Sequence, residues 1–391
     1  MQIETDSPEI ELTRTLSLEL LLSDHRADCE APCKVVCPGG LDIPAMNRLY
    51  DKDRFDEALT LLRDTLVIPA TLCFICPAPC EKICRKGSIN TAVPIRELKK
   101  ELVSRTDLQK VAKPPQNGMS VAVIGSDPLG LSAAYRLRKL GYRVRVFEKS
   151  GDVLFPHIQT DKVDRTALKG VVELEVSVLT NMGVEFVMSD ERDRLHELEE
   201  LDGVIAAVCE APSPKWLVPS AKTKQPARLV LEGCKLADAL HASLSVVDGT
   251  ATTVTTTFNS TFGRLSEAEV ASLGTELPTQ QVASGCLYCD CDKKTTCKLR
   301  LYATRYGIKS SRYGASSVFE ALHRQRINGS MWFEPAKCIR CGLCVYNSDN
   351  GFTFRDRGFV MQVVLPPENV GNVKEELADL CPTGGIWKDA P

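Results

Sequence analysis

The sequence predicts a multidomain protein of the α plus α/β class, with a helical first domain, a central α/β domain and a small cysteine-rich third domain. The chain has 391 residues, which is enough for two or three domains with buried cores. Of its 17 cysteines, 15 gather at the two ends, seven between Cys29 and Cys84 and eight between Cys286 and Cys381, and only Cys209 and Cys234 lie between them. The centre opens with a strand, a glycine turn and a helix, a pattern typical of a parallel sheet covered by helices.

The charge and the hydropathy of the sequence limit the classes of function that are expected. The net charge is −3 and no block of like charges occurs, so nucleic acid is not indicated as a partner. No apolar run approaches the roughly 20 residues that span a bilayer, and the acidic N-terminus does not resemble a signal peptide. We therefore expect a cytoplasmic protein without membrane insertion. In a reducing compartment so many cysteines indicate metal or redox chemistry rather than disulfides.

Breaks in the pattern suggest the domain boundaries. Residues 1–110 are predicted as a helical domain, because apolar residues between Ile43 and Thr65 recur at helical spacing. A proline-rich linker precedes an α/β domain over residues 118–250. Residues 251–280 form a threonine-rich linker that ends in a helix-capping pattern, and residues 281–391 form the third domain.

The third domain contains a strong metal-binding pattern. Cys338, Cys341 and Cys344 follow Cys-x2-Cys-x2-Cys spacing, and Cys381 precedes a proline. Three thiolates on a tight loop and one remote Cys-Pro hold a [4Fe-4S] cluster in bacterial ferredoxins. Ser348 stands where a second cluster would need a cysteine, so this pattern predicts one cluster in a ferredoxin-like domain. A structural zinc site is the alternative, although zinc sites usually pair two Cys-x2-Cys motifs.

A second group precedes this pattern. Four thiolates within a dozen residues, Cys286, Cys289, Cys291 and Cys297, could close one metal site by themselves. Together with the run CIRCGLC and the later CPTGG, this segment resembles the cluster-bearing part of the large iron–sulfur subunit of respiratory complex I and of related hydrogenases and formate dehydrogenases. That family has a histidine and three cysteines here. The resemblance implies that Cys286 replaces the histidine, and zinc stays open as an alternative.

The first cysteine block contains Cys29, Cys33 and Cys37, followed by Cys73, Cys76, Cys80 and Cys84. This block and the helices around it resemble the N-terminal double-cluster domain of the glutamate synthase small subunit and of dihydropyrimidine dehydrogenase.

The resemblance implies two [4Fe-4S] clusters with eight ligands, for which seven cysteines are present. The family begins its first run with Cys-x2-Cys, whereas Arg26 stands three residues before Cys29. Cys73 is a candidate for the gap, and His25 a weaker one. For the eighth ligand dihydropyrimidine dehydrogenase offers a glutamine where this chain has Lys99. Because a protonated lysine cannot ligate iron, Glu97, a water molecule or an incomplete cluster remain open.

The central domain begins with a Rossmann-like turn in a three-layer α/β unit. Gly125 and Gly130 keep the first and third glycines of the G-x-G-x-x-G pattern, and Glu148 ends the second strand as a ribose-binding acid would. Asp127 replaces the middle glycine and brings a side chain and a negative charge to the phosphate position. It could instead cap the following helix.

This segment resembles the FAD-binding domain of the same glutamate synthase family. Two further flavin contacts of that family are altered, at Cys209 and at Gly233–Cys234, and no second glycine-rich turn for a nicotinamide cofactor follows. The residues therefore argue against bound FAD, which remains an alternative. The other interpretation is a scaffold that packs the cluster domains together.

These observations predict an iron–sulfur electron-transfer subunit with three to four [4Fe-4S] clusters, docked on a catalytic oxidoreductase of the hydrogenase, dehydrogenase or synthase type. A flavin-dependent oxidoreductase and a non-redox zinc module are the alternatives. No catalytic nucleophile and base pair is indicated, because the remaining histidines stand apart from any serine or cysteine motif. These are His157, His196, His241 and His323.

Overall fold

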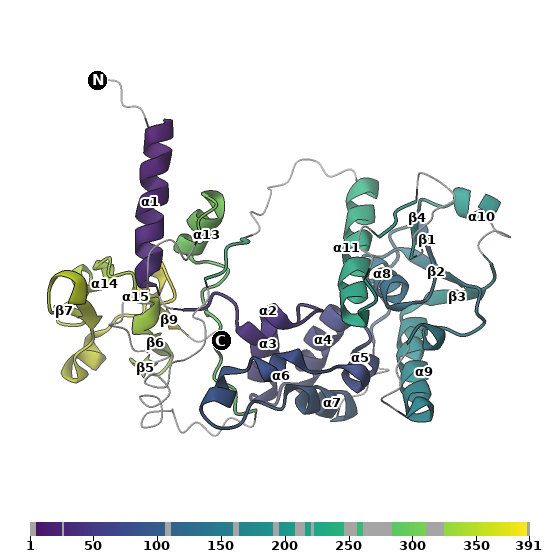
Figure 1. Cartoon of the computed structure of the whole chain (residues 1–391), viewed down its shortest axis with the longest axis horizontal. Helices are drawn as coiled ribbons and strands as arrows, with labels where there is room; N and C mark the ends of the chain where they lie inside the picture. Colours follow the sequence, from purple (N-terminus) through teal and green to yellow (C-terminus); the bar gives the residue numbers. More distant parts are fainter. Residues whose placement is uncertain are drawn as a thin grey trace.

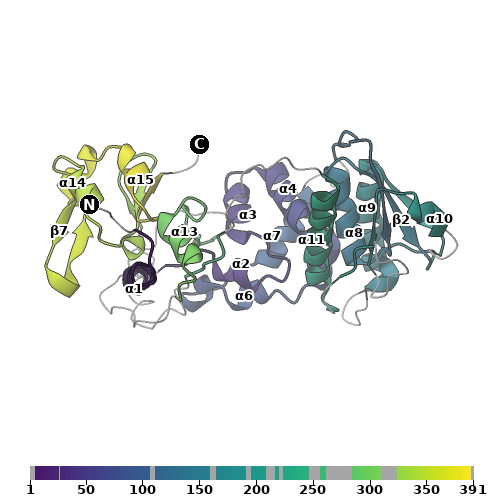
Figure 2. The ribbon, with the colours of Figure 1, turned by 90° about the horizontal axis from the view of Figure 1, so that it is seen from above.

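The structure is a computed structural model that describes residues 5–25, 27–105, 111–158, 164–190, 195–207, 216–219, 223–245, 256–260, 284–309 and 324–388. It is elongated, with the C-terminal elements at one end, the N-terminal helices in the middle and the α/β part at the other end (Figures 1 and 2). The α/β part is central in the sequence but terminal in space. As a result, the two cysteine-rich regions lie side by side.

The N-terminal region is helical, as predicted. Its elements are α1 (Pro8–Asp24), α2 (Pro32–Val36), α3 (Ile43–Tyr50), α4 (Phe55–Leu66), α5 (Pro69–Ile75), α6 (Pro79–Lys82), the 3-10 helix η1 (Arg85–Ser88) and α7 (Ile95–Arg105). The apolar stripe between Ile43 and Thr65 belongs to two helices rather than one. Asp53 has a positive φ of 57° and turns the chain between them. Met46 of α3 and Leu62 of α4 are both buried in the shared core.

Helix α1 does not join this bundle. Leu22, near its C-terminal end, is buried with Leu299 and Ala303 of α13 (Lys298–Arg305), a helix of the second cysteine block. Figure 2 shows α1 between α13 and the C-terminal elements. The predicted helical unit over residues 1–110 is therefore divided in space, because the apolar surface of α1 packs on the other end of the chain.

The α/β part contains a parallel sheet with strand order β3-β2-β1-β4. Its elements are β1 (Ser120–Ile124), α8 (Pro128–Lys139), β2 (Arg143–Glu148), η2 (Phe155–His157), α9 (Arg165–Met182), β3 (Val184–Met188), α10 (Leu195–Glu199), β4 (Gly203–Ala206) and α11 (Pro226–Leu244). Alternate residues of β1 face opposite layers, as strand geometry requires. Val121 and Val123 pack toward the N-terminal helices, while Ala122 and Ile124 pack with Leu198 of α10.

One hydrophobic core joins the helical and α/β parts. Leu62 and Leu66 of α4 belong to the same buried cluster as Leu131 of α8 and Val230 of α11. Gly233 allows α11 to approach α8 closely, because a side chain there would collide with the carbonyl oxygen of Leu129. The α/β part is therefore rigidly attached to the helices that carry the first cysteine block.

The C-terminal region has a separate core around Met331 and Phe333. Strand order β5-β6-β9 forms one antiparallel sheet, and β7 pairs with β8. Its elements are β5 (Gln325–Arg326), β6 (Met331–Phe333), η4 (Pro335–Lys337), α14 (Leu343–Tyr346), β7 (Thr353–Arg355), η5 (Gly358–Val360), β8 (Gln362–Val364), η6 (Pro367–Asn372), α15 (Glu376–Leu380) and β9 (Ile386–Lys388). The predicted capping pattern at Ser266–Glu269 lies outside the described residues.

Within the described ranges, no single helix is long and apolar enough to cross a membrane, and only α4 and α5 counted together, bent by 75°, meet that test.

Candidate metal centres

The first group of thiols, the junction site, surrounds a small pocket between the helical part and the loop over residues 284–294. Two cysteines from each region line this pocket. Burial, and then the charges of the neighbouring thiols, raise the pKa of Cys33, as expected for side chains that face one another. The junction site consists of Cys33, Cys84, Cys286 and Cys289.

This grouping differs from the sequence prediction, in which Cys286 and Cys289 shared a self-contained site with Cys291 and Cys297. The loop reverses at Tyr288, which has a positive φ of 48° and whose backbone N–H donates to Cys286 Sγ at 3.4 Å. The first two thiols of the loop therefore face the helical part. One sequence signal pointed to this arrangement: the first run, Cys29 to Cys37, lacks the Cys-x2-Cys pair with which the similar family begins it, and the loop supplies such a pair at 286–289.

A buried amide supports the fit of a cluster at the junction site. Asn47 of α3 is completely buried and lines the same pocket. Its amide lies against Cys286, where it opposes the rise in the thiol pKa that burial causes. The Asn47 amide has no oxygen or nitrogen partner among the described residues. Buried amides normally need a partner, and the sulfur atoms of a cluster would provide one.

The helical site is formed by residues from α2, α5 and α6. Cys73 lies within α5 and Cys76 ends that helix. Ala78, at a positive φ of 50°, turns the chain into α6, and its N–H donates to Cys76 Sγ at 3.4 Å. Burial raises the pKa of Cys80 to about 12; Lys99 opposes this rise, and two neighbouring thiols add to it. We group Cys37, Cys73, Cys76 and Cys80, whose charges all act on the buried Lys99, as the helical site.

The bridging site joins the two ends of the sequence. Cys291 N–H donates to the carbonyl oxygen of Cys29 at 3.2 Å. Cys297 caps α13, and its Sγ accepts the backbone N–H of Arg300 at 3.5 Å. The charge of Cys29 is among the causes that raise the pKa of Cys297, after burial. The bridging site consists of Cys29, Cys291 and Cys297.

His25 lies beside the bridging site. Ser260 connects the two, because its Oγ lies 3.5 Å from His25 Nδ1 and its N–H donates to Cys29 Sγ at 3.4 Å. Burial, and then the charge of Lys337, lower the pKa of His25 to about 4. The imidazole is therefore neutral near pH 7, the form that binds metals.

The C-terminal site surrounds a second pocket, lined by the cysteines whose spacing predicted a ferredoxin-like cluster. Arg340 and Gly342 have positive φ values of 56° and 76° and give the loop its tight curvature. Arg340 N–H donates to Cys338 Sγ at 3.3 Å. Cys341 is exposed. The C-terminal site consists of Cys338, Cys341, Cys344 and Cys381.

The helical and junction sites are neighbours because two short segments serve both. Cys33 and Cys37 lie four residues apart at α2, and Cys80 and Cys84 lie four residues apart around α6. Four residues of helix advance the chain by only about 6 Å.

The helical, junction and bridging sites form a row, because the bridging site lies next to the junction site. Cys289 of the junction site and Cys291 of the bridging site are separated by one residue. At the other side, Cys297 Sγ lies 3.7 Å from the carbonyl oxygen of Pro382, and a side chain at Gly384 would collide with Cys291 Sγ. Three of the elements that carry the row, α14, α13 and α2, follow one another along the long axis (Figure 2).

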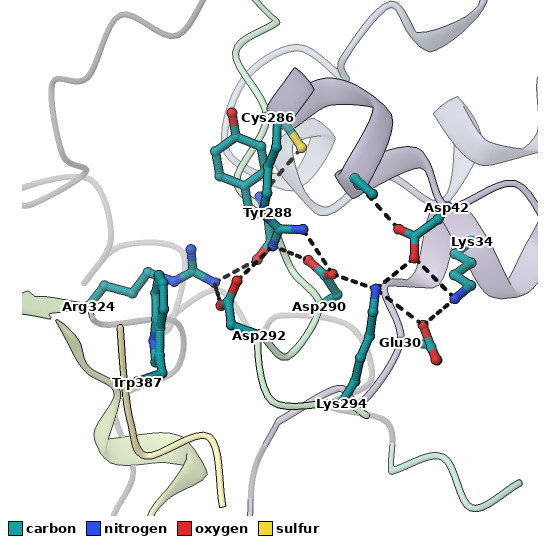
Figure 3. A network of polar contacts seen from close by, with 12 residues as sticks. Glu30, Lys34, Asp42, Cys286, Tyr288, Asp290, Asp292, Lys294, Arg324 and Trp387 are labelled. Atoms are coloured by element: carbon teal, nitrogen blue, oxygen red, sulfur yellow. Dashed lines mark hydrogen bonds and ion pairs between the residues drawn. The ribbon is translucent and has the colours of Figure 1, made fainter. Parts of the chain in front are cut away.

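A network of charged side chains holds the loop that serves the junction and bridging sites (Figure 3). Asp290 accepts two hydrogen bonds from Arg48 of α3, at 2.6 and 3.1 Å, and pairs with Lys294 at 3.0 Å. Burial favours the protonated acid, but these cations outweigh it and hold the pKa of Asp290 well below its usual range. Lys294 also reaches Asp42 of α3 at 2.7 Å. The loop is thus fastened to the helical part from both sides.

Cysteines that surround a cluster stand farther apart than the ligands of one ion. In a zinc site, each thiolate lies about 2.3 Å from the same ion. In the described part of the chain, no group of three or more His, Cys, Asp or Glu side chains is close enough to hold a single metal ion.

The nucleotide-like turn is closed by its own side chains. Gly125 has a positive φ of 94°, and a side chain at Gly130 would collide with the Gly125 carbonyl oxygen, so both glycines are required by the turn itself. Asp127 is the N-cap of α8, and its carboxylate accepts the Gly130 N–H at 2.8 Å. The capping role predicted for Asp127 is confirmed, and the cap occupies the helix end where a phosphate would bind.

Glu148 is also occupied. It is 3% exposed and accepts hydrogen bonds from the N–H and hydroxyl groups of Ser126, at 2.9 and 2.6 Å, and of Ser150, at 2.8 and 2.7 Å. His157 Nε2 lies 3.2 Å from the same carboxylate. Burial opposes ionisation, but these hydrogen bonds lower the pKa of Glu148 to about 2. The predicted ribose acid therefore has no free acceptor, and the residues present do not fit a dinucleotide.

Of the other two positions at which the flavin contacts of the similar family are altered, the structure describes only one. Gly233 is used in the close contact between α11 and α8, and Cys234 beside it is half-buried, with its pKa raised to about 11 by burial. Cys234 belongs to none of the four thiol groups. Cys209 lies outside the described residues.

Comparisons with known proteins agree with the two cofactor-type domains. Residues 22–111 match the family described as dihydropyrimidine dehydrogenase domain II, 4Fe-4S cluster. Residues 123–186 match the NAD(P)-binding Rossmann-like domain family. The protein thus contains a region similar to a 4Fe-4S cluster domain, followed by a Rossmann-like domain.

Curated relatives include subunits of oxidoreductases. The NADPH-Fe(3+) oxidoreductase subunit beta of Geobacter sulfurreducens is 31% identical over 191 residues, 46% of this chain and 28% of the relative. The NADP(+)-dependent formate dehydrogenase subunit beta of Moorella thermoacetica is 30% identical over 193 residues, 40% of this chain and 27% of the relative. The glutamate synthase [NADPH] small chain of Bacillus subtilis is 33% identical over 162 residues, 40% of this chain and 32% of the relative. The chain thus spans about a third or less of these relatives.

Among solved structures, the 6-hydroxypseudooxynicotine amine oxidase of Pseudomonas geniculata N1 aligns at a TM-score of 0.24, with 24% identity over 42% of this chain and 24% of that chain, a score too low to define a shared fold.

Proposed function

We propose that this protein is an electron-transfer subunit that relays single electrons through four [4Fe-4S] clusters held in a row. A [4Fe-4S] cluster bound by thiolates accepts and donates one electron. The observation that carries the proposal is the grouping of 15 cysteines into four neighbouring sets, two of which each line a pocket with four thiols. The order is helical site, junction site, bridging site and C-terminal site.

Three sites have four thiols, and the bridging site has three. We propose His25 as its fourth ligand, because the neutral imidazole and Cys29 share contacts with Ser260. The His25→Ala variant is then expected to lose only the bridging cluster, while His25→Cys retains it. Iron per chain and electron paramagnetic resonance of both variants would test this assignment.

The C-terminal site is the proposed contact with a redox partner. Cys341 is exposed there, whereas Cys33, Cys73 and Cys291 are half-buried or buried in the other sites. The relatives named above are subunits of larger oxidoreductases, which supports a catalytic partner of the hydrogenase, dehydrogenase or synthase type. The ferredoxin-like interpretation of residues 281–391 is part of this proposal.

The Rossmann-like part is proposed to act as a scaffold. Glu148 and Asp127, which would meet a nucleotide, already have protein partners. The shared core with the N-terminal helices supports this role, because it stiffens the helices that hold the helical and junction sites. The match of residues 123–186 to the NAD(P)-binding Rossmann-like family is what favours the flavin-dependent alternative.

Cofactor content of the full chain purified without oxygen tests the proposal. We expect about 16 iron atoms and as many acid-labile sulfides per chain, four of each per cluster. Acid-released flavin and zinc should be close to zero. One flavin per chain, or zinc in place of iron, would overturn the relay and favour one of the two alternatives.

A further inference from the structure

Lys99 is a buried lysine in the middle of the packed face of α7. It is 4% exposed and lies on the helix face that also buries Ile95, Leu98 and Leu102. Lysine is almost never this buried unless its charge has a partner. The position therefore needs an explanation beyond helix packing.

The groups that face Lys99 are the thiols of the helical site. Helix α7 packs against α5 and α6, which carry three of these thiols. The negative charges that act on Lys99 come from Cys73, Cys76, Cys80 and Cys37. No carboxylate within the described ranges forms an ion pair with Lys99, whereas the adjacent Lys100 pairs with Glu97 at 3.0 Å on the exposed side of α7.

Two cations near the junction and bridging sites differ in this respect. Lys337, beside Cys291, pairs with Glu334 at 2.9 Å. Arg85, beside Cys289, pairs with Asp28. Their charges are largely compensated by carboxylates, so they change the field at the neighbouring thiols less than an uncompensated cation does.

An uncompensated cation beside a cluster changes the reduction potential of that cluster. Four thiolates and an iron–sulfur core carry a net negative charge, and one added electron makes it more negative. A fixed cation in a low-dielectric surrounding stabilises the more negative state, which raises the reduction potential. The transfer moves one electron from the neighbouring junction site, and no proton or bond is exchanged.

We propose that Lys99 is the counter-cation of the helical site and that it raises the reduction potential of this site, which favours the collection of electrons there. This inference rests on the proposed function, since it requires a cluster at the helical site. In this proposal Lys99 acts through its charge and does not bind iron. The four ligands of the cluster are then Cys37, Cys76, Cys80 and Cys73.

The test is a redox titration, followed by electron paramagnetic resonance, of the full chain and three variants. Cys80→Ser first identifies the signal of the helical site by its loss. Lys99→Met should then shift the midpoint potential of that signal to a lower value and leave the other signals in place. Lys99→Arg, which keeps the charge, should stay close to the unsubstituted protein. Lys100→Met, which removes a more exposed charge that is paired with Glu97, should cause a much smaller shift.

The inference is overturned if Lys99→Met leaves the potential unchanged, or if Lys99→Arg lowers it as much. If Lys99→Met loses the cluster, retention in Lys99→Arg supports the need for a cation, and loss in both variants contradicts it. Failure of the proposed function looks different: Cys80→Ser would then remove neither iron nor a signal from the protein.

Discussion

The loop over residues 284–294 and the turn over residues 125–130 both carry ligand-binding motifs, and the polar groups around them have opposite effects. In the loop, carboxylates pair with Arg48 and Lys294, which fixes the backbone and leaves Cys286 and Cys289 lining a pocket. In the turn, the polar groups that would bind a nucleotide bind each other. A ligand-binding motif can bind its ligand only where its ligand-binding side chains have no partners within the protein. The charged residues around such a motif can pair with one another and still hold the backbone in place.

The largest effect is expected when one thiol of the loop over residues 284–294 is removed. Cys286→Ser is expected to lose the junction cluster, about four iron atoms per chain. Cys338→Ser should lose the C-terminal cluster alone, and Cys234→Ser should lose none, because Cys234 belongs to no thiol group. Iron analysis and the loss of individual paramagnetic signals would measure this. Equal losses in Cys234→Ser and Cys286→Ser would refute the grouping.

A smaller effect is expected from the network that holds the loop. Asp290→Asn removes the charge that compensates Arg48 and Lys294, and its side chain is only 1% exposed. Breaking a buried pair in this way costs about 3–5 kcal/mol. We expect a lower free energy of unfolding and faster iron loss from the junction and bridging sites.

Glu57→Gln is the matched control for Asp290→Asn, because Glu57 forms an exposed ion pair with Arg54. It should change neither stability nor iron retention measurably. If the two variants behaved alike, the network would not be what holds the loop.

For the turn over residues 125–130, the variant Glu148→Gln tests whether the ionised carboxylate of Glu148 stabilises the fold. Its pKa of about 2 lies below the ordinary 4.5, so its ionised form contributes stability above pH 4.5 that is lost as the pH falls through 2. At about 1.4 kcal/mol per pKa unit, the variant should be about 3 kcal/mol less stable at pH 7 and equal to the unsubstituted protein below pH 2. Chemical unfolding across this pH range measures the difference, and a constant difference at all pH values would contradict it.

The smallest effect is expected at Asp127. Asp127→Ala removes the cap of α8 and should cost about 1 kcal/mol, whereas Asp127→Gly should cost only a few tenths. Asp127→Gly also restores the middle glycine of the nucleotide turn. Because Glu148 stays occupied, we expect no flavin in this variant. One flavin per chain after acid release would show that the aspartate alone closes the site.

Local features could be predicted from the sequence. The strand predicted to open the central domain is β1, the helix predicted after its glycine turn is α8, and the cap at Asp127 follows from residues three positions apart. The four cysteines of the C-terminal site meet as their spacing suggests, because three of them lie within seven residues. Short segments of this kind have few alternative conformations, so residue spacing largely determines their geometry.

The division of the remaining cysteines was decided by the tertiary structure alone. Cys29 and Cys291 are separated by more than 200 residues in sequence, yet a backbone hydrogen bond joins them. The Cys-x2-Cys spacing of Cys286 and Cys289 hints at their link to the first run, but the spacing does not show that Cys291 and Cys297 instead face Cys29 and the C-terminal region. That choice depends on the packing of α1 against α13 and on the ion pairs of Asp290, which are contacts between distant segments. The sequence by itself determined which side chains could bind metal, and only the packing of distant segments decided which of them lie together.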